Sequence, residues 1–137
     1  MHYSAKITKE EGTYLVSFPD FENINSCGDT IEKALLNASE ALNGALESDF
    51  ERGFSLPAEK KYSGKNYFQI QVHPHLEIAY TLRRLRKNRS QIDVARALGI
   101  SYQAYQRLEN PRKCNPTIKT LEKISQVLGR KLEVSFS

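Results

Sequence analysis

The side chains in this sequence that are best suited to chemistry are polar ones that could read the edges of DNA bases. They fall on one predicted helix: Tyr102, Gln103, Gln106 and Arg107. They are the residues left facing outward once Tyr105 and Leu108 face inward, and the pairs Tyr102/Gln106 and Gln103/Arg107 are each four residues apart, one above the other on the helix. Glutamine can pair with the major-groove edge of adenine and arginine with that of guanine. This group predicts a helix that contacts bases.

The segment Ser90–Glu109 is expected to position that helix as the second half of a helix-turn-helix. Ala95 is small, as required where two helix axes pass closest. Gly99 can adopt the positive φ that ends the first helix, and Ser101 can cap the second. Apolar side chains fall where the two helices meet: Val94, Leu98, Ile100, Tyr105 and Leu108. Each feature alone suits any helical hairpin, but their order predicts a DNA-binding module.

Further polar residues could hold such a module on the DNA backbone. Asn110, Arg112 and Lys113 follow in a loop, where contacts to phosphates would set register without reading sequence. A solvated loop is the alternative. The helix expected over Leu76–Lys87 has a basic face that could add phosphate contacts or simply be solvated. That face consists of Arg83, Arg84, Arg86 and Lys87.

The charge of the chain is divided unevenly between its halves. Residues 1–72 hold seven lysines and arginines against eleven aspartates and glutamates, whereas residues 73–137 hold thirteen against five. The halves therefore carry net charges of −4 and +8 within a total of +4. This division predicts two domains with different partners, the basic one being the candidate for nucleic acid. A basic surface that serves only solubility is the alternative.

Residues 1–72 predict a small antiparallel sheet with one packed helix. Apolar residues alternate along three of the four expected strands, the first, second and last, and the first two are joined by a polar connection ending in glycine, which indicates a β-hairpin. A helix capped by Asp29 or Thr30 and ending near Gly53 carries an alanine- and leucine-rich stripe that suits close packing on a sheet. The expected strands are Tyr3–Thr8, Thr13–Phe18, Asn23–Cys27 and Tyr67–Val72.

Residues 77–137 predict an all-α domain followed by a strand, so the fold class is α+β. Thr117 can cap a last helix over Ile118–Leu128, whose core face would include Ile118. Lys131–Phe136 then alternates as a strand, which has no partner in a helical domain and is expected to pair with the first domain or with another copy. The break at residues 73–76 is the expected linker between the domains.

Two histidines and two cysteines in the sequence have spacings that bear on metal binding. His73 and His75 lie in the linker without a third ligand nearby, and Cys27 and Cys114 show no ligand spacing. We therefore expect no metal or other cofactor and a reduced, cytoplasmic protein. The first residues show no signal-peptide pattern, and no stretch is long and apolar enough to span a bilayer.

The segment QIDVARALGISYQAYQRLEN resembles the Cro/C1-type (XRE) helix-turn-helix family, with its Gln, Val-Ala, Leu-Gly-Ile-Ser and closing Leu-Glu-Asn. The resemblance implies phosphate contacts for Gln91, Ser101 and Asn110. It implies base contacts for Tyr102, Gln103 and Arg107. Tyr102 is bulkier than the usual residue, and Pro111 stands where the family often has glycine.

The segment YLVSFPDFENINSCGDTIEKALLNASEALNGAL resembles the HicB antitoxin family, apart from Glu22-Asn23 in place of the common Pro-Gly. This resemblance implies a partial RNase H-like fold and an antitoxin that masks a HicA-type mRNA-cleaving toxin and represses its own operon. An acidic domain would complement a basic, RNA-binding toxin. We hypothesise that Asp20, Glu22 and Asp29 contribute to the toxin-facing surface. The repressor is expected to be at least a dimer, joined in part by Lys131–Phe136.

Two other functions are weighed against the antitoxin. A nuclease of RNase H type would need several carboxylates around a metal, but only Asp20 and Asp29 flank a loop here, so we expect no enzyme. A stand-alone helix-turn-helix regulator with a ligand- or partner-binding first domain is the main alternative. A neighbouring gene for a small basic protein would favour the antitoxin.

Overall fold

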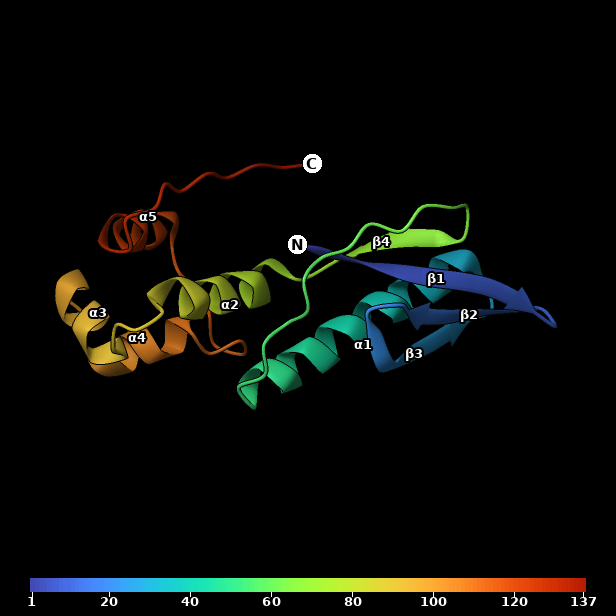
Figure 1. Cartoon of the computed structure of the whole chain (residues 1–137), viewed down its shortest axis with the longest axis horizontal. Coiled ribbons are helices and arrows are strands. Elements are labelled where there is room, and N and C mark those ends of the chain that lie inside the picture. The colour runs from blue at the N-terminus through green and yellow to red at the C-terminus, as the bar shows by residue number, and fades with distance from the viewer. The chain divides into compact units, whose positions relative to one another are not determined.

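The computed structural model describes all residues, 1–137, and divides into two compact units. Unit 1 comprises Met1–Glu77 and unit 2 comprises Ile78–Ser137. The elements of each are labelled in Figure 1, where unit 1 contains the sheet and the long helix α1. No helix is long and apolar enough to cross a membrane.

Unit 1 is built on a four-stranded antiparallel sheet in the order β3-β2-β1-β4. Glu11 and Gly12 join β1 to β2 with positive φ angles of 49° and 81°, as a tight hairpin turn requires. The predicted hairpin and both further strands are confirmed. The strands are β1 (His2–Glu10), β2 (Thr13–Phe18), β3 (Phe21–Gly28) and β4 (Tyr67–Gln71).

Helix α1 (Ile31–Glu51) lies along one face of this sheet. Of the two candidate caps, Thr30 is the one used, because its side chain accepts a hydrogen bond from the backbone of Lys33 at 3.1 Å. The helix ends before Gly53, whose φ of 85° favours glycine. Alanines on the buried stripe let the helix approach the sheet closely.

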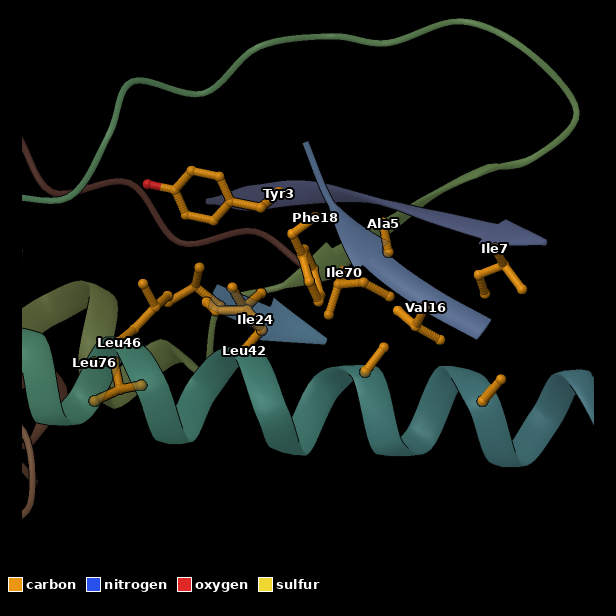
Figure 2. Packing of buried hydrophobic residues seen from close by; sticks show 13 residues of the cluster. Tyr3, Ala5, Ile7, Val16, Phe18, Ile24, Leu42, Leu46, Ile70 and Leu76 are labelled. Carbon is orange, nitrogen blue, oxygen red and sulfur yellow. The ribbon is translucent and has the colours of Figure 1, made fainter. Parts of the chain in front are cut away.

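The space between α1 and the sheet is filled by apolar side chains, which Figure 2 shows pointing toward one another from both layers. Full burial of one such side chain contributes about 1.5–3 kcal/mol to folding. Asn43 is the polar exception: it is buried, donates to the Gln71 carbonyl at 3.2 Å and accepts from the His73 amide at 2.7 Å. These bonds fasten α1 to the end of β4.

The connection from α1 to β4 has no regular secondary structure, but side chains tie it to the sheet. The hydroxyl of Tyr62 donates to Asp20 at 2.7 Å, and its ring stacks on that of Tyr67. The hydroxyl of Tyr3 donates to the Pro57 carbonyl. The long connection is therefore held against β1, against the start of β4 and against the turn between β2 and β3.

The rest of the chain forms four helices around a second core. This core centres on Val94, Ala95 and Tyr105, all buried, with Leu82, Leu108 and Ile124 beside them. The helices are α2 (Pro74–Arg86), α3 (Gln91–Leu98), α4 (Tyr102–Leu108) and α5 (Ile118–Val127).

Three predicted details differ in the structure. The expected linker, residues 73–76, is mostly helical, because Pro74 begins α2 and the His73 carbonyl accepts from the amides of Leu76 and Glu77. No strand forms over 131–136 in the single chain, since a strand needs a partner and the helical unit offers none. Ile118 is 58% exposed rather than part of the core face of α5.

Candidate nucleic-acid interface

The turn between α3 and α4 is set by three residues in a row. Gly99 has a φ of 72° and ends α3, and the amide of Ile100 donates back to the Ala95 carbonyl at 3.0 Å. Ser101 then caps α4 by accepting from the Ala104 amide at 3.1 Å. The predicted helix-turn-helix is present, with Ala95 buried where the helices meet.

Helix α4 has one buried side and one exposed side. Tyr105 and Leu108 point into the core of unit 2. All four residues predicted to contact bases lie on the exposed side: Tyr102, Gln103, Gln106 and Arg107. Tyr102 is 38% exposed and begins the helix. The exposed side of α4 therefore combines amide, guanidinium and phenol groups, which can pair with base edges.

The loop after α4 turns tightly and directs two cations outward. The side chain of Asn110 accepts from the Arg112 amide at 2.9 Å, and the Asn110 carbonyl accepts from the amides of Lys113 and Cys114. Arg112 and Lys113 are exposed, whereas Pro111 and Cys114 are buried. Burial raises the pKa of the Cys114 thiol to about 11, so this cysteine stays protonated at neutral pH. The exposed cations can reach phosphates beside α4.

A buried ion pair braces the helix-turn-helix from within. The guanidinium of Arg86 donates two hydrogen bonds to the carboxylate of Glu109, at 2.7 and 2.9 Å. A third comes from the side-chain amide of Gln91 at 3.1 Å. Arg86 also donates to the Arg89 carbonyl at 2.8 Å. The end of α2, the start of α3 and the end of α4 are thus tied to one carboxylate.

The ionisation of this cluster follows from its surroundings. Burial is the largest single influence and would raise the pKa of Glu109, but the hydrogen bonds from Arg86, Tyr105 and Gln91 and the positive charge of Arg86 together lower it below its ordinary value. The same hydrogen bonds raise the pKa of Arg86. The Tyr105 hydroxyl is buried in this unit without a hydrogen bond of standard geometry, and burial raises its pKa. The pair is therefore charged across the physiological range.

The residues predicted to contact phosphates differ in whether their side chains are exposed or already hydrogen-bonded within unit 2. Gln91 is half-buried and its amide group is directed to Glu109, and the Ser101 hydroxyl is taken up by the cap of α4. Asn110 is half-buried and shapes its own loop. Arg112 and Lys113 extend into solvent.

The acidic candidates of unit 1 do not converge. Asp20 and Glu22 flank the start of β3, whereas Asp29 follows its end, roughly 22–31 Å away by the rise of a strand. Asp20 accepts from Tyr62, and Asp29 pairs with Lys33 at 3.4 Å. Glu22 is exposed on the strand. No group of three or more histidine, cysteine or acidic side chains could hold a metal ion.

The comparisons with known proteins match both units. Residues 2–74 match the model of the HicB-like antitoxin of bacterial toxin-antitoxin systems, and residues 82–134 match a helix-turn-helix model. The chain is 31% identical over 127 residues to Antitoxin HicB 1 of Photorhabdus laumondii, covering 93% of this chain and 81% of the relative. The chain belongs to the HicB-like antitoxin family.

Two further similarities span different parts of this HicB-like chain. It is 28% identical over 134 residues to Antitoxin HicB 2 of the same organism, covering 98% of this chain and 95% of the relative. The N-terminal domain of the antitoxin HicB of Burkholderia pseudomallei matches with 26% identity and a TM-score of 0.48, covering 53% of this chain and 98% of that one. The two family models leave residues 75–81 between them, which form the first half of α2.

Sequence reasoning about this HicB-like chain missed the role of Arg86 and Glu109. Arg86 was grouped with its basic neighbours as a phosphate contact or a solvated charge, yet it is directed inward to Glu109. The residues lie 23 positions apart, so no periodicity links them. The only signal was the closing Leu-Glu-Asn of the helix-turn-helix pattern, which placed a carboxylate directly after the buried Leu108.

Proposed function

We propose that this HicB-like antitoxin neutralises a HicA-type mRNA-cleaving toxin through unit 1 and represses its own operon through unit 2. The observation that carries the proposal is the opposite charge of two units with two different family matches. Residues 1–77 hold seven cations against twelve acidic residues, and residues 78–137 hold thirteen against four. The net charges of −5 and +9 suit a basic protein partner and DNA respectively.

The proposed toxin partner would be complementary in charge to the acidic unit 1. A protein that binds RNA carries cations on its RNA-binding surface, and an acidic partner can cover that surface and accelerate association. Asp20, Glu22 and Asp29 remain our proposed contacts. Because they lie at opposite ends of β3, they would mark the two ends of a toxin footprint rather than one pocket.

The DNA partner would be bound by α4 in the major groove. Gln103, Gln106 and Arg107 would read base edges, and Tyr102 would contact the groove at the start of the helix. Arg112 and Lys113 would bind phosphates from the following loop. Gln91, Ser101 and Asn110 would add only weaker phosphate contacts, because their side chains already form the hydrogen bonds described above. Operator preference would then depend on α4, and salt dependence on the loop.

A second copy of the chain would complete the repressor. One helix in one groove gives limited affinity, whereas a two-fold dimer binds two half-sites about 34–36 Å apart. Val134 and Phe136 are 60% and 99% exposed in the single chain. Pairing of residues 131–136 with the same segment of a second copy would supply the missing strand partner and cover these side chains.

We assign no catalysis to the protein. The favoured function needs only binding, and the acidic residues of unit 1 form no cluster able to hold a metal ion. A stand-alone regulator remains the competing function, and it predicts that growth in the presence of the neighbouring gene product does not depend on this chain.

Co-expression with the product of the gene beside that of this chain tests the proposal, which expects this product to be a small basic toxin. The full chain should restore growth. A full-length Arg107→Ala/Lys113→Ala variant should still restore growth but lose operator binding. The Asp20→Ala/Glu22→Ala/Asp29→Ala variant should do the reverse, because its changes lie in the other unit. Failure of the unaltered chain to restore growth, with normal operator binding, would favour the stand-alone regulator.

A further inference from the structure

Unit 1 contains a cavity of about 280 Å³ at the end of the sheet from which α1 starts. Ile7 of β1, Ile31 of α1 and Phe68 of β4 line it, and all three belong to or pack against the core of unit 1. The cavity is therefore an open end of the apolar core, left because α1 begins at Ile31 and covers the sheet no further. Such a surface favours an apolar or aromatic ligand group.

Cationic groups stand at the same cavity. Lys9 and Lys65 both line it, from β1 and from the connection that precedes β4. The Lys9 ammonium lies 5.4 Å from the centre of the Tyr14 ring, which also lines the cavity, and neither lysine forms an ion pair. Two other cations of unit 1 are neutralised by neighbours: Lys33 by Asp29 and Arg52 by Asp49.

The two lysines at the cavity are positively charged, whereas unit 1 as a whole is negatively charged. Unit 1 carries a net charge of −5, yet two of its seven cations, Lys9 and Lys65, lie at one cavity. They would repel a basic toxin at this place rather than attract it. The cavity is thus separate in chemistry from the partners assigned above.

We propose that this cavity binds a small phosphorylated ring compound of the nucleoside monophosphate class. Lysine ammonium groups bind phosphate as compact point charges, so Lys9 and Lys65 hold the phosphate at the rim. The ring lies against Tyr14 and Phe68, which offer aromatic surface. Asn66, also at the rim, provides an amide for hydrogen bonds to the polar edge of the ring. The volume of about 280 Å³ suits a ligand of this size, because drug-sized ligands occupy pockets of roughly 300–1,000 Å³.

Titration of the full chain with uridine 5′-monophosphate, followed by amide NMR spectra and calorimetry, tests this assignment. Saturable binding should shift the signals of Thr8, Lys9, Lys65 and Asn66 and leave those of α4 in place. Inorganic phosphate and uridine, titrated separately, should each bind at least about tenfold more weakly, because each has half of the contacts. Equal affinity for phosphate alone would overturn the ligand class.

A matched pair of variants separates the site from general electrostatics. Lys9→Gln/Lys65→Gln should weaken binding of the monophosphate by roughly tenfold or more. Lys60→Gln/Lys61→Gln removes the same charge from exposed positions of the same unit outside the cavity, and it should leave affinity unchanged. Equal losses in both variants, or no saturable binding by the unaltered chain, would overturn the proposal. Toxin and operator binding are measured separately, so this result does not depend on the proposed function.

Discussion

Unit 1 encloses thirteen buried residues in its core cluster, whereas unit 2 encloses six and adds the buried Arg86–Glu109 pair. A smaller core buries less apolar surface and contributes less stability. In unit 2, therefore, a polar cluster fixes the positions of the helices, whereas in unit 1 apolar packing does so. The helix that carries the candidate base contacts is oriented by charged hydrogen bonds, whereas the sheet is held by apolar packing. Damage to each unit should differ accordingly.

Removing the central carboxylate should have the largest effect. Glu109→Ala leaves the half-buried Arg86 without its partner and frees the side chain of Gln91. We expect unit 2 to lose about 3–5 kcal/mol of unfolding free energy, which for a small helical unit abolishes operator binding. Hydrogen exchange followed residue by residue should show the loss in unit 2 and leave the sheet protected.

The control for this change is Asp93→Ala, which removes an exposed pair with Arg96 at 3.8 Å in the same unit. The expected loss is below about 1 kcal/mol. A comparable loss for both variants would mean that the buried pair has no special role in unit 2.

The same carboxylate predicts how unit 2 responds to acid. Because the pKa of Glu109 is lowered on folding, its stabilisation is fully present above the unfolded value near 4.5 and is lost as the pH falls through the lower folded pKa. Urea unfolding between pH 3 and 7 should show this loss in unit 2, and Glu109→Gln should remove that part of the pH dependence. A pH profile unchanged by Glu109→Gln would contradict the assignment.

In unit 1 the sensitive point is a close approach rather than a charge. A Cβ added at Gly28 would lie 2.8 Å from the Cα of Ala34, which is backbone in the first turn of α1. Gly28→Ala should therefore displace α1 and cost about 1–3 kcal/mol. Gly44→Ala, on the exposed side of α1 with nothing within 4 Å, should instead stabilise by roughly 0.5–1 kcal/mol. Thermal unfolding monitored on unit 1 measures both, and equal signs would refute the close approach.

Changes on the exposed side of α4 should alter recognition without altering stability. Arg107→Ala should cost about 1–3 kcal/mol of operator binding and relax preference at one base pair, because a base contact is lost. Competition with operators mutated one position at a time measures this. Loss of affinity that is uniform across all sequences would show that Arg107 binds phosphate instead.

The smallest effect is expected from the loop after α4. Lys113→Ala should weaken binding to every sequence similarly and reduce the slope of log affinity against log salt by about one unit. Titrations at several salt concentrations measure the slope. A change in base preference would place Lys113 at the base edges.

The elements predicted correctly from sequence depend on bonds between near neighbours. Thr30, Ser101 and Thr117 each cap a helix through an amide three residues away. Gly99 needs only its own positive φ to end α3. The burial of Ile118 was predicted incorrectly, because burial depends on how whole helices pack. Residues 131–136 form no strand in the single chain, and their pairing with a second copy stays a prediction.

The candidate DNA contacts divide in the same way. Exposure of Gln103, Gln106 and Arg107 follows from helical spacing once Tyr105 and Leu108 are recognised as buried. The inward direction of Gln91 and Arg86 could not be predicted, because it depends on where Glu109 lies in three dimensions.

By itself, the sequence determined the hairpin, the long helix and the helix-turn-helix, because capping, turn formation and amphipathic spacing act over a few residues. The opposite charges of the two halves follow from composition alone. Only the tertiary structure decided which polar side chains are turned inward. It joined Arg86 to Glu109 across 23 residues and Tyr62 to Asp20 across 42. It also left the cavity beside Lys9 and Lys65, which residues distant in sequence line together. Such contacts depend on how whole elements pack, and no local pattern encodes them.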